Sequence, residues 1–155
     1  MAMEKVLTGA AGEYYVAFRL AAMGYAVGLT TRGVSTIDLI VANVKTSKSI
    51  TIQTKTMLNA FTGSKRDNEY WWKWRMGISV KPVEDTFFFT FVDMKGDAAN
   101  VPDVFIVSSI KVSGLFDEYK NDKGELVDRW VGITKGSKEE VKYKNRWDVF
   151  KKVLG

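Results

Sequence analysis

The chain has no cysteine and no histidine among its 155 residues. Without cysteine there is neither a disulfide framework nor a thiolate metal site. Without histidine there is no Ser-His-Asp triad, no His-ligated zinc and no histidine general base. A catalytic centre must therefore use carboxylates, amides, hydroxyls, lysine or arginine, and any metal is expected to be a hard cation with oxygen ligands.

Long apolar runs are also missing, because no stretch reaches the roughly 18 apolar residues of a transmembrane helix. The first five residues lack the charged-then-apolar order of a signal peptide. We therefore expect a cytoplasmic protein, associated with the nucleoid if it is bacterial. With 46% hydrophobic and 26% charged residues, the chain is expected to form one globular domain over residues 1–155. The net charge of +5 fits a polyanionic partner and a solvated basic surface equally well.

Two segments rich in β-branched residues, 36–41 and 50–56, predict strands that carry polar groups among aliphatic ones. Asp38 follows Ile37 and precedes further aliphatic residues, where an unpaired carboxylate is expensive. Gln53 and Lys55 are two residues apart and so share one face of a strand. The polar stretch 42–49 favours an antiparallel hairpin between the strands. A metal-and-lysine site is one interpretation, and a structural ion pair between Asp38 and Lys55 is the other.

A helix is predicted over residues 3–24, ending near Gly24. Its apolar stripe is expected to face the domain and to consist of Val6, Ala10, Ala17 and Leu20. Glu13 lies on the same stripe, so we expect its carboxylate either to face the interior or to reach water from the stripe's edge. The small residues at 9–12 would allow a close approach to a sheet.

Further along, we expect strands at 25–29, 87–92 and 104–107, with 87–92 buried on both faces, and a loop at 59–68. Ser108 is expected to cap a helix that runs to about Tyr119, and a short strand is expected at 130–133. Asn145 is expected to cap a last helix, which packs through Trp147, Phe150 and Leu154.

The segment 70–75, YWWKWR, is the densest mixture of aromatic and basic residues in the chain. The tryptophans could stack on nucleic-acid bases or fill a core or interface. We favour the structural interpretation for the tryptophans. Phosphate contact and simple solvation are equally plausible for the basic residues.

The order of these features resembles the PD-(D/E)xK nuclease superfamily, which includes restriction endonucleases, Holliday-junction resolvases and some homing endonucleases. The likeness rests on Glu13 in the helical GAAGE run, Asp38 in IDLIV, and Gln53-Thr54-Lys55 on the next strand. It covers the first 57 residues well and implies an α/β fold with a restriction-endonuclease-like αβββαβ core, a mixed sheet flanked by helices. Ile37 stands where proline is common, and Gln53 stands where Glu or Asp is usual.

The resemblance implies a Mg²⁺ site, with Mn²⁺ as a substitute, formed by Asp38, Gln53 and the carbonyl of Thr54. Lys55 would orient or deprotonate the attacking water. Glu13 would bind the metal through water, hold a second metal or fix Lys55. A minority of the superfamily carries Gln-x-Lys. Because glutamine adds no charge, metal affinity would rest more on Asp38.

The function implied is a metal-dependent endonuclease that hydrolyses phosphodiester bonds in duplex DNA, of the site-specific homing or restriction type. The alternatives are a structure-specific Holliday-junction resolvase, a catalytically silent DNA-binding protein on the same fold, or a nuclease acting on RNA. A homodimer or homotetramer is expected, because both strands must be cut. Specificity would come from the loops at 30–35 and 58–76. The expected phosphate-contacting residues are Arg32, Lys45, Lys48, Lys65, Arg66, Lys73 and Arg75.

Overall fold

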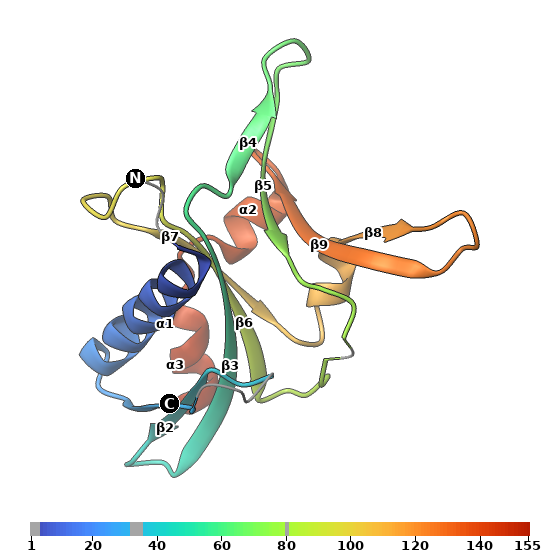
Figure 1. Cartoon of the computed structure of the whole chain (residues 1–155). Coiled ribbons are helices and arrows are strands. Elements are labelled where there is room, and N and C mark those ends of the chain that lie inside the picture. The colour runs from blue at the N-terminus through green and yellow to red at the C-terminus, as the bar shows by residue number, and fades with distance from the viewer. Residues whose placement is uncertain (1–3, 32–35, 80) are drawn as a thin grey trace.

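The computed structural model describes residues 4–31, 36–79 and 81–155. One helix, α1, precedes a five-stranded mixed sheet with the order β1-β2-β3-β6-β7 (Figure 1). Neighbouring strands are antiparallel except for the parallel pair β3 and β6. The elements are α1 (Lys5–Ala22), β1 (Ala26–Leu29), β2 (Leu39–Asn43), β3 (Lys48–Met57), β6 (Phe87–Asp93) and β7 (Asp103–Ser108).

A second, antiparallel sheet has the order β4-β5-β9-β8. Two of its hairpins, β4–β5 and β8–β9, project from the body of the molecule at the top and right of Figure 1. The elements are β4 (Phe61–Ser64), β5 (Glu69–Arg75), the 3-10 helix η1 (Val112–Leu115), β8 (Phe116–Lys120), β9 (Leu126–Thr134), α2 (Lys138–Tyr143) and α3 (Asp148–Leu154).

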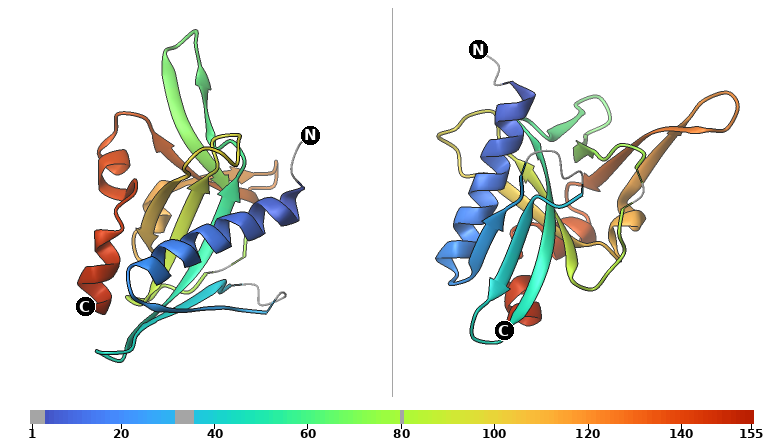
Figure 2. Two further views of the ribbon diagram at one scale, coloured as in Figure 1. Left: turned by 90° about the vertical axis from the view of Figure 1, so that its left-hand side faces the viewer. Right: turned by 60° about the horizontal axis from the view of Figure 1, so that its bottom comes forward.

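The five-stranded sheet lies between two hydrophobic clusters. Helices α1 and α3 cover one face (Figure 2), and the second sheet with α2 covers the other. Strand β6 serves both clusters, because Phe88 faces the helices while Phe89 and Phe91 face the second sheet. All seven residues of β6 are buried, which confirms the predicted strand with two covered faces.

These observations confirm the predicted fold class, an α/β protein with a mixed sheet flanked by helices. The crossover from β3 to the parallel strand β6 runs through the β4–β5 hairpin, at the point where the αβββαβ order has a helix. Among the described residues, no helix is long and apolar enough to span a membrane.

Helix α1 packs through a face that is rotated from the predicted one and shares Leu20 with it, while Ala17 lies at its edge. Its buried residues are Thr8, Gly12, Val16 and Leu20, whereas Val6, assigned to the inner stripe, is 60% exposed. The reason is close packing on β3: the small residues at 8 and 12 bring the helix backbone near the strand. Val16 and Leu20 fill the wider space beyond. The helix ends where predicted, since Gly24 has a φ of 95°, a conformation that favours glycine.

Two predictions in the middle of the chain are wrong. Residues 59–68 were predicted as a loop, but Phe61–Ser64 within them form strand β4, and only 59–60 and the turn at 65–68 are irregular. The stretch after Ser108 forms η1 and β8 rather than one helix. Here the hydroxyl of Ser109 donates to Glu84 O at 2.7 Å and its amide donates to Phe87 O at 2.9 Å. These bonds hold the chain against the adjoining loop and β6 instead of starting a helix.

Near the C-terminus, Asn145 does not cap the last helix. It has a φ of 53°, and its side-chain oxygen accepts from the amide of Val104 at 2.9 Å, which ties it to β7 instead. The short strand predicted at 130–133 is the longer β9. The predicted packing is confirmed, because Trp147, Phe150 and Leu154 are all buried.

The closeness of α1 to β3 gives a stability prediction. A Cβ added to Gly12 would overlap the Thr56 side chain, lying 2.8 Å from its Cβ and Cγ2. Overpacking costs about 1–3 kcal/mol and alanine gains about 1 kcal/mol over glycine in a helix, so we expect Gly12→Ala to lower the free energy of unfolding by up to about 2 kcal/mol. Denaturant titration measures the change.

The matched control is Gly9→Ala, in the same helix, where an added Cβ meets nothing within 4 Å. This variant should be as stable as the parent or slightly more stable. Introducing Gly12→Ala into a Thr56→Ala background removes the overlap with the hydroxyl and Cγ2 but leaves the contact with Cβ, so the loss should become smaller. An equal loss in both backgrounds would contradict the packing explanation.

Candidate active site

Asp38 lies immediately before β2, at the point where β2 and β3 separate. Its amide donates to Ile52 O at 2.9 Å, and its carboxylate oxygen Oδ2 accepts from the amide of Thr54 at 2.7 Å. The register pairs Leu39 with Ile52. The predicted hairpin is therefore confirmed, and Asp38 lies beside the Gln53–Lys55 segment.

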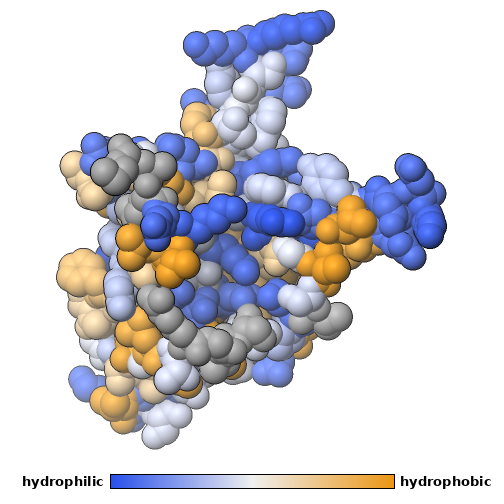
Figure 3. Space-filling view, in the orientation of Figure 1, coloured by the Kyte–Doolittle hydropathy of each residue, from blue (hydrophilic) through white to orange (hydrophobic). Residues whose placement is uncertain are grey.

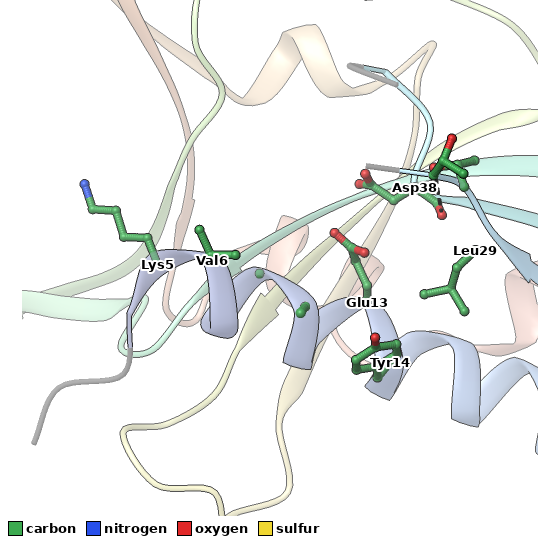
Figure 4. A pocket seen from close by; sticks show the side chains of 10 residues that line it. Lys5, Val6, Glu13, Tyr14, Leu29 and Asp38 are labelled. Carbon is green, nitrogen blue, oxygen red and sulfur yellow. Dashed lines mark hydrogen bonds between the residues drawn. The ribbon is translucent and has the colours of Figure 1, made fainter. Parts of the chain in front are cut away.

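Glu13 faces Asp38 from α1. Both residues line a pocket of about 470 Å³ between the first turns of the helix and the chain leaving β1. Figure 4 shows the Glu13 carboxylate directed from the helix towards Asp38. Glu13 therefore combines features of the two predicted orientations: it is half-buried at the edge of the helix's buried face, and its carboxylate is directed into this pocket.

Gln53, Thr54 and Lys55 occupy consecutive positions of β3. Gln53 and Thr54 are buried, and the hydroxyl of Thr54 is 2.9 Å from the hydroxyl of Thr90 on β6. Lys55 is half-buried and lines a second pocket of about 730 Å³, which lies between β3 and the second sheet. Lys5 borders both pockets. The strand carrying Lys55 therefore borders two adjoining cavities.

Burial is the largest cause of the pKa shifts of Asp38 and Lys55. It raises the pKa of Asp38, although the Thr54 amide and the positive charges of Lys55 and Lys81 act in the opposite direction. It also lowers the pKa of Lys55, against the attraction of Asp38. The ion pairs between described residues do not include one joining these two side chains. The geometry therefore differs from that of a structural ion pair.

Lys81 is a third charged group at this place, and the sequence did not single it out. It is half-buried in the segment between β5 and β6. Burial lowers its pKa first, and repulsion by Lys55 lowers it further, while Asp38 raises it. Because Lys81 lies in an irregular segment, no spacing in the sequence links it to Asp38. Two lysines beside one carboxylate favour the approach of an anion.

The donor set fits a hard cation. Asp38 and Glu13 offer carboxylate oxygens from two separate elements to one pocket. Among described residues, no group of three or more His, Cys, Asp or Glu side chains forms a complete cage. Mg²⁺ is commonly held by one or two carboxylates, with water and substrate oxygens completing its shell. Two carboxylates are sufficient for that mode of binding.

The predicted basic residues do not form one surface. Lys65 and Arg66 lie at the tip of the β4–β5 hairpin. Lys45 and Lys48 lie at the β2–β3 turn, at the other end of β2 from Asp38. Five or more strand residues at about 3.3 Å each separate that turn from the pocket. Arg32 lies outside the described residues, as does most of the 30–35 loop.

Strand β5 separates its aromatic and basic side chains. Trp72 and Trp74 are buried in the cluster between the sheets, which confirms the structural interpretation for these two residues. Lys73 donates to the hydroxyl of Tyr119 at 3.0 Å. Arg75 donates to Asp128 at 3.1 Å and borders the larger pocket. Both basic residues are thus held by partners on the β8–β9 hairpin.

No family model matches the chain, and no curated protein matches it. Among solved structures, it is similar to the bacterial homing endonuclease I-Ssp6803I, with a TM-score of 0.58 over 93% of this chain and 90% of that one. The two sequences are 14% identical over this alignment. The chain therefore shares the fold of a bacterial homing endonuclease.

Proposed function

We propose that this protein is a metal-dependent endonuclease that hydrolyses phosphodiester bonds at a specific site in duplex DNA. The observation that carries the proposal is the meeting of Glu13 and Asp38 across one pocket, with Lys55 on the adjacent strand and not ion-paired to Asp38. The fold likeness to a homing endonuclease supports the same conclusion.

The chain's own groups have distinct parts in this chemistry. The lowered pKa of Lys55 increases the neutral fraction of its amine, which can accept a proton from the water that attacks phosphorus. Lys81 places positive charge where the phosphate gains negative charge. Glu13, Asp38, Gln53 and the Thr54 carbonyl would hold Mg²⁺ or Mn²⁺. When bound, the cation supplies Lewis-acid polarisation of the phosphate and lowers the pKa of water.

A catalytically silent DNA-binding protein is the second candidate. It is favoured by Gln53, which occupies the position of the usual acidic residue and is 3% exposed. A neutral amide contributes no charge to metal binding, so the site depends on two carboxylates. A cleavage assay separates the two candidates.

The test begins with selection of a binding site from a randomised duplex library, followed by cleavage of the selected duplex in Mg²⁺ and in Mn²⁺. We expect the wild-type protein to cut both strands. Asp38→Asn and Lys55→Met should each lower the cleavage rate by about 10²–10⁴-fold, the usual loss for a proton-transfer or charge-stabilising group. Lys45→Ala, at the distant turn, should cleave at the parental rate.

Cleavage that persists in both site variants would overturn the site assignment. Binding of the selected duplex without cleavage in either cation would favour the silent protein. Preferential cleavage of a four-way junction over the selected duplex would favour a resolvase. Cleavage of an RNA duplex and not of DNA would show that the substrate is RNA.

Asp38 should also reduce stability at neutral pH. Its pKa is raised in the folded chain, so its contribution to stability is fully present below the unfolded value of 3.8 and is lost as pH rises through the folded pKa. Asp38→Asn cannot ionise and keeps an oxygen acceptor for the Thr54 amide. We expect this variant to be more stable than the parent at pH 7, with the advantage shrinking towards pH 4.

Denaturant titrations at pH 4.5, 5.5 and 7 measure this dependence. Asp122→Asn, which removes an exposed carboxylate at the β8–β9 turn, controls for the change in net charge. If the parent is more stable than Asp38→Asn at pH 7, the burial argument is wrong. That result would favour the interpretation of Asp38 and Lys55 as a structural ion pair.

The projecting hairpins give a prediction for DNA binding. We assign phosphate contact to Lys65 and Arg66 at the tip of the β4–β5 hairpin, whereas Lys45 and Lys48 lie at the opposite end of the molecule in Figure 1. Each lost phosphate contact lowers the slope of log K against log salt concentration by about 0.9. Removing both hairpin charges should therefore reduce the slope by about 2.

The matched control is the Lys45→Ala/Lys48→Ala double variant, which makes the same change in net charge at the other end. Its salt slope should equal that of the parent. Equal reductions in the two double variants would mean that net charge, and not hairpin contact, determines affinity.

A further inference from the structure

The outward face of α1 is apolar along its whole length. Four large side chains on this one helix are exposed, with Val6 at 60%, Leu7 at 55%, Tyr14 at 62% and Phe18 at 64%. Leu7, Tyr14 and Phe18 are seven and four residues apart, so they form one stripe on the helix. Alanines lie beside them: Ala21 is exposed, whereas positions 10, 11 and 17 are half-buried, and Ala11 and Ala17 also pack against the internal cluster. In Figure 3 apolar surface (orange) gathers over the position of α1, on the left of the view.

The charged residues of α1 are directed elsewhere. Glu13 points into the candidate active site (Figure 4). The guanidinium of Arg19 lies 4.5 Å from the centre of the Trp147 ring and donates to the Tyr15 hydroxyl at 3.1 Å. Lys5 borders the two pockets. A helix whose second face meets water normally carries polar residues there, so this face has the composition of a covered surface.

We propose that the outer face of α1 binds the same face of a second copy of this chain, as an antiparallel helix pair about a two-fold axis. An axis near the middle of the helix places Leu7 against Phe18 of the partner subunit and Ala11 against Tyr14 of the partner subunit. One pair then joins two large apolar side chains, and the other joins a small side chain to a large one. The two-fold axis repeats each pair, as in any isologous interface. The alanines allow the helices to approach closely.

The chemistry of the face favours a second copy over other occupants. The stripe carries no charge, so it offers nothing to the phosphates of DNA or to a charged peptide. The choice rests in part on the proposed function, because a chain with one candidate active site needs a second chain to cut both strands.

The four exposed side chains supply only part of the area that a dimer interface needs. Taking about 150–250 Å² for a whole aromatic side chain, the four exposed side chains present on the order of 400 Å². Such an area is typical of a functional patch on a monomer and about half of what one partner buries in a standard interface. The alanines and the neighbouring Leu29, 46% exposed, extend the same apolar surface.

The pairing would also adjoin the candidate active site. Val6 and Tyr14 line the same pocket as Glu13 and Asp38. A partner packed on α1 would therefore form part of the outer wall of that pocket. Association and the geometry around the two carboxylates are linked in this arrangement.

Sedimentation velocity of the full chain, without DNA or metal and over a wide concentration range, tests the proposal. We expect a concentration-dependent dimer. Phe18→Glu and Leu7→Glu should each raise its dissociation constant by about 100-fold or more, because the two-fold axis buries each introduced charge twice. Val141→Glu, at a side chain that is 74% exposed on α2, is the matched control and should dimerise like the parent. Circular dichroism verifies that each variant folds.

A charge-swapped variant tests the antiparallel geometry. Leu7→Glu combined with Phe18→Lys places opposite charges together twice across the antiparallel pair, so dimerisation should recover relative to either single variant. A parallel pair would bring like charges together and weaken association further.

A parent protein that stays monomeric throughout overturns the proposal. So does a dimer that is insensitive to Phe18→Glu, which would require a different face. Flotation of the parent, but not of Phe18→Glu, with phosphatidylcholine vesicles would assign the face to a lipid surface instead. These measurements do not depend on cleavage. If the protein dimerises through α1 but cuts no DNA, the proposed function is wrong and the dimer proposal is still supported.

Discussion

The hydrogen bond from the Thr54 amide to the Asp38 carboxylate, at 2.7 Å, controls the geometry of the site. The β2–β3 ladder ends where Asp38 donates its own amide to Ile52 O. The side chain of Asp38 then supplies the acceptor for the Thr54 amide that a further backbone carbonyl would otherwise provide, which a nearly buried amide requires. The same bond orients the carboxylate and fixes the segment that carries Lys55. A group suited to chemistry therefore also completes the hydrogen bonding of a central strand.

This dual role explains why these residues could be grouped as a candidate site from the sequence. A carboxylate inside an aliphatic run, followed by an amide and an amine on the next strand, breaks a pattern that the rest of each strand obeys. The hairpin that joins them depends on local alternation and a polar turn, and both are visible in the sequence. Strand β6 was predictable for a similar reason, since four phenylalanines and Val92 within six residues are typical of a strand covered on both sides.

Other features depend on contacts that leave no local pattern. The buried face of α1 is selected for closeness rather than apolarity, so Thr8 and Gly12 face the sheet while Leu7 faces outwards. Lys81 reaches the site from a segment far along the chain, and sequence spacing carries no information about such a meeting. The predicted helix after Ser108 failed because tertiary hydrogen bonds of Ser109 outweighed a local capping preference.

The way in which the β4–β5 hairpin is anchored determines which part of it can change in length and sequence. The hairpin is inserted between β3 and β6, and its base is anchored by Ala60, whose amide donates to Asp93 at 3.0 Å, and by Trp74, whose indole donates to Val92 O at 2.9 Å. Among the strands of the described residues, β4 pairs only with β5 beyond these anchors. Exposed tips tolerate insertion and replacement well, so the outer hairpin can lengthen, shorten or change its side chains while the strands below keep their register. The chain thus joins a centre fixed by strand pairing to an outer segment that can accept changes in length and sequence.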